Sequence, residues 1–125
     1  MDGQDVRELV LACDLVDDEA AAAEYERFHS PGGVPDAVLQ SIVDADVRNM
    51  RIFRAGTRRL IMIMSVGPGF DADQKAQADA SNPDVVAWER RMDPFQVRVP
   101  GSDAKWCLAR QIFDLEQHAM QLSGQ

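Results

Sequence analysis

Tyr25 and His29 are the residues of this sequence best suited to exchange protons with a ligand. Residues four apart on a helix are neighbours on its surface, so a helical segment would bring the phenol and the imidazole to one point. Imidazole both accepts and donates a proton near neutral pH. Because the chain has one tyrosine and only two histidines, we interpret the pair as a candidate acid–base site in which His29 and Tyr25 are the catalytic residues.

Each candidate residue also has a purely structural interpretation. His29 could cap the C-terminal end of its helix, where the helix dipole favours a cation. Tyr25 could be a core residue whose hydroxyl reaches the surface. Trp88 could present a flat apolar face to a sugar ring or simply pack in the core, and Trp106 is expected in the core or at an interface.

The elements that must position these side chains follow from hydrophobic periodicity and from turn residues. Apolar or alternating runs predict four strands, at residues 9–15, 50–54, 60–66 and 105–113. Capping residues and helical spacing predict four helices: residues 19–28 behind Asp17 and Asp18, a stretch through residues 38–43, a polar helix at residues 71–80, and one from Asn82 that ends at Pro94. Residues 114–125 are expected to form a flexible tail or a frayed helix.

The predicted order is strand, helices, strand, strand, helices, strand, which is the βαββαβ plan of a ferredoxin-like α+β sandwich. At 125 residues, we expect a single domain over residues 1–125. Helices cover only one face of such a sheet, so alternate residues of the strands at 60–66 and 105–113 need another cover. A homodimer that stacks sheet on sheet would supply that cover.

The charge and the cysteines restrict the partners and the compartment. A net charge of −8 is not the basic footprint that binds nucleic acid, nor does it suit an anionic membrane surface. No apolar run could span a bilayer, and residues 1–6 do not read as a signal peptide. Cys13 and Cys107 lie in separate apolar runs, so we expect both to be reduced and buried in a cytoplasmic protein.

No pattern in the sequence predicts a metal or an organic cofactor. His29 and His118 are far apart, and neither closely spaced His or Cys pairs nor acidic clusters at ligand spacing occur. The acidic residues at positions 17–19, 71 and 73 fall at predicted helix starts, where the helix dipole accounts for them. We therefore expect chemistry that is carried by side chains alone.

Many short segments, taken in order, resemble the L-rhamnose mutarotase family, and most closely its L-fucose-type branch. The resemblance runs from Leu9 to Leu115, and the order and spacing of the segments together are specific. The matching segments are residues 11–15 with Asp17 and Asp18, residues 24–25 with His29, and residues 31–32, 50–54, 60–64, 75–76, 79–80, 82–83, 86–89, 92, 95–96, 100–101, 105–106 and 112–113.

The resemblance implies a dimeric α/β barrel that interconverts the α and β anomers of a 6-deoxyhexose, L-fucose or L-rhamnose, with no cofactor and no metal. It places His29 at the catalytic histidine and Tyr25 at a substrate-binding tyrosine. Met50 falls where rhamnose-type members hold another sugar-contacting tyrosine. Trp88 and Glu89 fall on a pair that is Trp-Trp in rhamnose-type members and Trp-Glu in the fucose-type branch, so Glu89 favours the latter.

These residue types suit ring opening and closure. One group must take the proton from the anomeric hydroxyl and one must protonate the ring oxygen. We expect His29 to shuttle the proton and Tyr25 to position or polarise a sugar oxygen. Trp88 would stack on the apolar face of the sugar, and Glu89 would bind hydroxyls or act as a partner base.

Two stretches depart from the family pattern. Members usually carry a tryptophan in the loop that this chain fills with residues 33–36, around Pro35. Fucose-type members tend to carry one before Phe95, where this chain has Asp93 and Pro94. Losing two aromatic walls predicts a wider or reshaped pocket.

Two other functions compete with the mutarotase. One is a non-catalytic or differently catalytic dimeric α/β-barrel protein that binds a small ligand in the same cavity, with His29 acting only as a hydrogen-bond donor. The other is a protein-interaction module, which has little support beyond the acidic charge.

Overall fold

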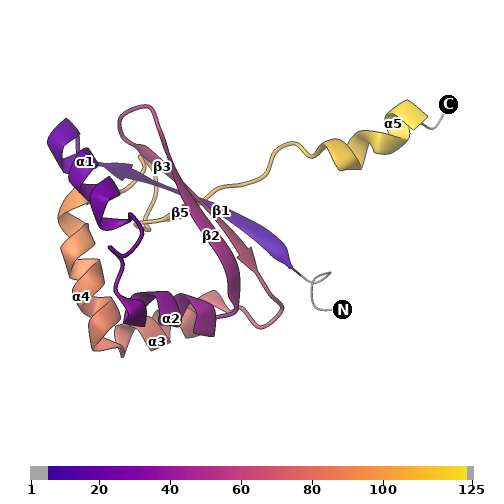
Figure 1. Ribbon diagram of the computed structural model, residues 1–125. Helices are drawn as coiled ribbons and strands as arrows, with labels where there is room; N and C mark the ends of the chain where they lie inside the picture. Colours follow the sequence, from indigo (N-terminus) through magenta and orange to yellow (C-terminus); the bar gives the residue numbers. More distant parts are fainter. Residues whose placement is uncertain (1–5, 124–125) are drawn as a thin grey trace.

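The computed structural model describes residues 6–123 as an α+β fold built on a curled antiparallel sheet (Figure 1). β1 (Arg7–Leu15), β3 (Arg59–Val66) and β2 (Val47–Ala55) lie side by side, and β4 (Gln96–Val97) pairs with the other edge of β1. The strand order is β2-β3-β1-β4, and a two-residue strand, β5 (Cys107–Leu108), also pairs with β1. The predicted α+β class is confirmed.

Four helices accompany the sheet, at positions close to those predicted. They are α1 (Glu19–Phe28), α2 (Asp36–Asp44), α3 (Ala72–Ala80) and α4 (Pro83–Met92), and a short 3₁₀ turn, η2 (Asp93–Phe95), follows α4. Figure 1 shows α1 and α4 along one side of the sheet and α2 and α3 near one end of it. No helix among residues 6–123 is long and apolar enough to cross a membrane.

Side-chain caps set where three of these helices begin. The Asp18 carboxylate accepts hydrogen bonds from the amides of Ala20 and Ala21 at 2.9 and 3.3 Å. Asp71 and Asn82 cap α3 and α4 in the same way. Because such caps satisfy amides that have no partner within the helix, these helix starts could be read from a few neighbouring residues.

The core lies between the helices and one face of the sheet. Its main cluster of buried residues brings together α1, α2, α4 and the ends of β1 and β3, and comprises Leu15, Ala22, Tyr25, Val38, Leu60, Val85, Trp88 and Met92. Tyr25 and Trp88 therefore belong to the core, as their structural interpretation predicted.

The other face of the sheet carries apolar residues that stay accessible. Strand register aligns two cross-strand rows on it, one of Phe53, Ile61, Ala12 and Cys107 and one of Arg51, Ile63 and Val10. Phe53 is 46% exposed and Val10 is 36% exposed. Cys13 is buried and Cys107 is only half-buried, and both are free thiols. The expectation that Cys107 would be buried is thus wrong, because β5 lies at the edge of the sheet.

The predicted strand over residues 105–113 is wrong in extent. Only Cys107–Leu108 pair with β1, and one more hydrogen bond joins the Ala109 amide to the Val10 carbonyl at 2.7 Å. Beyond this point the chain leaves the sheet and runs out to the C-terminal helical turns (Figure 1), with Ile112 86% exposed and Phe113 64% exposed. Alternation shows that a segment has an apolar face, but not which surface covers that face.

The C-terminal residues are partly helical rather than irregular. η3 (Leu115–His118) is followed directly by α5 (Ala119–Ser123). This confirms the helical interpretation of the predicted tail, whose last two positions, 124–125, lie outside the described residues. The missed strand β4 takes the far end of the β1 edge, next to Asp14 and Leu15.

Candidate active site

The last turn of α1 places Tyr25 and His29 next to each other. Their ring centroids are 4.4 Å apart, with 33° between the ring planes. Tyr25 is only 3% exposed, because it lies on the face of α1 that packs into the core. His29 is the C-cap residue of α1, and its backbone amide donates to the Glu26 carbonyl at 3.0 Å.

A backbone hydrogen bond fixes the tautomer of His29. The ring atom Nδ1 lies 2.7 Å from the Tyr25 carbonyl oxygen. A carbonyl oxygen only accepts hydrogen bonds, so Nδ1 carries the hydrogen. In the neutral imidazole the other nitrogen, Nε2, is then unprotonated and can accept a proton. One contact therefore serves both interpretations of His29. It caps the helix, as the structural interpretation predicted, and it orients the ring as a base requires.

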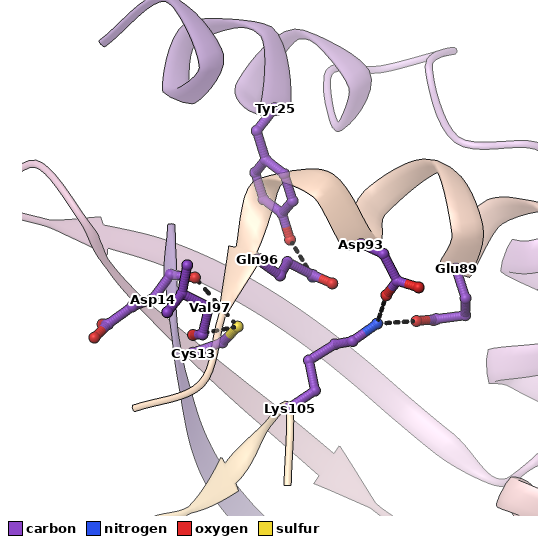
Figure 2. Close-up of polar contacts among 8 residues, drawn as sticks. All are labelled: Cys13, Asp14, Tyr25, Glu89, Asp93, Gln96, Val97 and Lys105. Carbon is purple, nitrogen blue, oxygen red and sulfur yellow. Dashed lines mark hydrogen bonds and ion pairs between the residues drawn. The ribbon is translucent and has the colours of Figure 1, made fainter. Parts of the chain in front are cut away.

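α4 supplies the aromatic ring and the carboxylate expected beside His29. The Trp88 ring meets the His29 ring edge to face, with centroids 5.4 Å apart, and Trp88 is 8% exposed. The next residue, Glu89, is exposed, and its carboxylate lies 3.2 Å from Lys105 Nζ. Lys105 also pairs with Asp93, so one ammonium group holds two carboxylates (Figure 2).

The two carboxylates around Lys105 shift the pKa of its ammonium group. Burial lowers the pKa of the ammonium group, but hydrogen bonds to Asp93 and Glu89 outweigh burial and raise the pKa above its usual value. Lys105 thus remains a cation that fixes the position of the Glu89 carboxylate. Asp93 serves as the second anchor of Lys105.

The Tyr25 hydroxyl meets a side chain that sequence reasoning gave no role. Gln96, on β4, donates from Nε2 to Tyr25 Oη at 3.1 Å (Figure 2). Burial raises the pKa of Tyr25 from 10.0 to about 12, although the Gln96 hydrogen bond opposes this rise. The phenol therefore keeps its proton at neutral pH and can donate it in a hydrogen bond.

All the predicted site residues line one cavity of about 460 Å³. This volume lies within the range of ligand pockets, roughly 300–1,000 Å³. Its wall includes Tyr25, His29, Met50, Trp88 and Glu89. Met50 comes from β2, and further apolar wall comes from the helix-facing side of the sheet and from α2, through Leu11, Met62, Met64, Val38 and Leu39.

The cavity also has polar groups to which the sequence analysis assigned no role in the site. Gln96 and Ser41 line it, together with Lys75 and Asp79, which form an ion pair of 2.6 Å one turn apart on α3. The i, i+4 spacing of Lys75 and Asp79 was visible in the sequence, but it is equally typical of a solvated helix surface. Among residues 6–123, no group of three or more His, Cys, Asp or Glu side chains gathers as a metal site would.

Comparisons with known proteins identify the family of the chain. The sequence model of the family described as L-rhamnose mutarotase matches residues 9–115. An L-fucose mutarotase of Xanthomonas campestris pv. campestris is 41% identical over 114 residues, which cover 90% of each chain. The crystal structure of an L-rhamnose mutarotase from Formosa agariphila shares the fold, with a TM-score of 0.63 and 18% identity over 86% of this chain and 97% of that one. The chain belongs to the L-rhamnose mutarotase family and is a sugar mutarotase.

Proposed function

We propose that this protein interconverts the α and β anomers of a 6-deoxyhexose and prefers L-fucose to L-rhamnose. The observation that carries the proposal is the cavity that His29 and Tyr25 line together, with their ring centroids 4.4 Å apart and the His29 Nδ1 atom held by the Tyr25 carbonyl oxygen. The preference for L-fucose rests on the 41% identical L-fucose mutarotase and on Glu89, the fucose-type residue beside Trp88.

His29 is the group that moves the proton. Nε2 takes the proton of the anomeric hydroxyl as the bond between C1 and the ring oxygen breaks, and the carbonyl of the open-chain aldehyde forms. The imidazolium then gives that proton to the ring oxygen, so charge and atoms balance. Rotation about C1–C2 and the reverse steps close the ring on the other face. Proton transfer of this kind contributes typically 10²–10⁴-fold to a rate.

The other site residues hold the sugar. Tyr25 donates a hydrogen bond to the ring oxygen, where negative charge develops as the ring opens. The Trp88 ring packs against the apolar face of the sugar, and Glu89, fixed by Lys105, accepts hydrogen bonds from hydroxyl groups. Met50 supplies apolar wall near the sugar in place of a second tyrosine.

We further propose that the working form is a homodimer in the cytoplasm, with two ferredoxin-like sheets facing each other as a dimeric α/β barrel. The apolar rows around Ile61 and Ile63 and the residues Ile112 and Phe113 support it, because a single chain leaves the first two only partly buried and the last two exposed. The free thiols of Cys13 and Cys107 suit a reducing compartment.

Saturation-difference NMR of anomer exchange tests the activity. Purified wild type should accelerate exchange of L-fucose more than that of L-rhamnose, and His29→Ala should abolish the acceleration. His118→Ala is the matched control, because His118 is the other histidine and is exposed on η3. A folded wild type that accelerates neither sugar would refute the proposal and leave the non-catalytic ligand-binding protein as the better description.

A further inference from the structure

We propose that Gln96 is a positioning residue that fixes the direction of the Tyr25 hydroxyl proton, so that Tyr25 can only donate toward the sugar. This inference rests on the proposed function and deepens it. Gln96 lies on β4, which the sequence did not predict, and the two residues are 71 positions apart.

The hydrogen bond between the two side chains has a direction. Gln96 Nε2 donates and Tyr25 Oη accepts, at 3.1 Å. Figure 2 shows the two side chains pointing toward each other. A phenol has one proton, and an oxygen that is accepting on one side turns that proton to another. In the part of the chain that the structure describes, no other side chain pairs with Oη. The proton is therefore left for a ligand in the cavity that both residues line.

Gln96 is an unfavourable choice for packing alone. Its Oε1 atom is buried and has no hydrogen-bond partner among residues 6–123. A buried acceptor without a partner destabilises a fold, and an apolar side chain of similar length would avoid that penalty. Buried polar atoms without a partner are expected mainly at functional sites. Within residues 6–123 the side-chain amide makes one hydrogen bond, to Tyr25, and this bond accounts for a glutamine at this position.

Packing anchors the backbone of Gln96 and the ring of Tyr25. The backbone of Gln96 pairs with Leu15 of β1, and the neighbouring carbonyl of Phe95 accepts from the Val16 amide at 2.9 Å. The Phe95 ring meets the Tyr25 ring edge to face, with centroids 5.9 Å apart. The strand pairing fixes the backbone from which the Gln96 side chain extends, and the Phe95 ring restrains the Tyr25 ring.

Four variants test the role. Gln96→Met keeps length but donates nothing, so kcat should fall by roughly tenfold or less, the worth of one neutral hydrogen bond, with little change in KM. Gln96→Glu places a group that accepts the phenol proton, and kcat should fall further than in Gln96→Met. Tyr25→Phe removes the hydroxyl. The double variant with Gln96→Met should therefore have the same kcat as Tyr25→Phe alone.

Because Tyr25 is the only tyrosine, the ¹³C resonance of its Cζ reports the same hydrogen bond without any assay of activity. The resonance should shift in Gln96→Met and stay in place in Gln40→Met, a surface glutamine on α2 that bonds Asp44. Gln96→Met should also be at least as stable as wild type to urea, since it removes the buried orphan oxygen.

Each failure has its own signature. An unmoved Cζ resonance in Gln96→Met overturns the hydrogen bond. A shifted Cζ resonance with an unchanged kcat overturns the positioning role but leaves the mutarotase activity in place. The same holds if Gln96→Met lowers kcat equally in wild type and in Tyr25→Phe. A wild type that is silent on both sugars is instead a failure of the proposed function, and is seen before any variant of Gln96 is made.

Discussion

His29 combines two roles that a single substitution can separate. Its Nδ1–H caps the Tyr25 carbonyl at 2.7 Å, and its Nε2 is the proposed base. His29→Asn keeps a short side-chain donor that can cap the carbonyl but has no base, so it should lose the rate acceleration and keep the stability. His29→Ala should lose both, with a drop of about 0.5–1.5 kcal/mol in the free energy of unfolding.

Anomer exchange and urea unfolding of the two variants measure these effects side by side. Activity retained by His29→Asn would contradict the role of Nε2. A large loss of stability in His29→Asn would show that the ring is needed for packing rather than for chemistry.

Trp88 is both core residue and cavity wall, so its substitution should affect stability and binding together. Trp88→Ala should lower the free energy of unfolding by about 3–5 kcal/mol, the usual loss for a large buried ring, and raise the KM for L-fucose. Trp88→Phe retains a flat ring and should lose less of each. Unfolding curves and KM values should be measured on the same samples. A loss of stability with no change in KM would show that Trp88 is only a core residue.

The buried hydroxyl and thiol make the protein sensitive to alkali. Burial raises the pKa of Tyr25 from 10.0 to about 12 and that of Cys13 from 9.0 to about 11. Each group holds its proton more tightly in the folded protein than in the unfolded chain. Its contribution to stability is therefore complete below the ordinary pKa and is lost as the pH rises through the pKa of the folded protein. One pKa unit is about 1.4 kcal/mol, so Tyr25 alone should account for a loss of about 2–3 kcal/mol by pH 12.

Urea unfolding between pH 8 and pH 12 tests this dependence. Cys13→Ala should flatten the curve between pH 9 and pH 11, and Tyr25→Phe should flatten it above pH 10. A free energy of unfolding that does not change over this range would contradict the burial of both groups.

At the scale of the elements, α3 is the helix among α1 to α4 whose presence packing explains least. None of its residues is buried, yet it presents the Lys75–Asp79 pair to the cavity, with the lysine side chain 19% exposed and the aspartate 27% exposed. We expect this pair to bind those hydroxyl groups of the sugar that are remote from the anomeric carbon. Asp79→Asn should therefore raise the KM for L-fucose several-fold, about 1 kcal/mol of lost binding, while kcat changes little.

Asp44→Asn is the matched control for this prediction. Asp44 accepts a hydrogen bond from Gln40, also four residues apart, at 2.8 Å on the exposed surface of α2. Equal KM values for wild type and Asp79→Asn would show that the pair on α3 is only a helix-surface contact.

The elements also show how far local patterns reach. The caps at Asp18, Asp71 and Asn82 act within three residues, and the helices that they start were predicted within a residue or two. β4 was missed because two residues carry no periodicity, and β5 was overestimated because the alternation continues past the last residue that β1 can pair.

At the scale of the molecule, the open face of the sheet predicts the oligomeric state. Light scattering coupled to size exclusion should give twice the 13.9 kDa chain mass. Ile63→Lys, in the middle of the open face, should yield a monomer, because a buried lysine without a partner is unfavourable. Val43→Lys is the control, since Val43 is exposed on α2 and not on the sheet. A wild-type mass of one chain would contradict the dimer.

Features that depend on near neighbours could be predicted from the sequence alone. The spacing of Tyr25 and His29 put both rings on one turn of α1, the capping residues set the helix starts, and apolar runs marked β1 and β3. The tertiary structure decided what depends on distant segments: the partner of the Tyr25 hydroxyl, the anchor of Glu89, and the turn of Lys75 and Asp79 toward the cavity. Contacts within one helical turn follow from chain geometry, whereas contacts across tens of residues exist only once packing has chosen which surfaces meet.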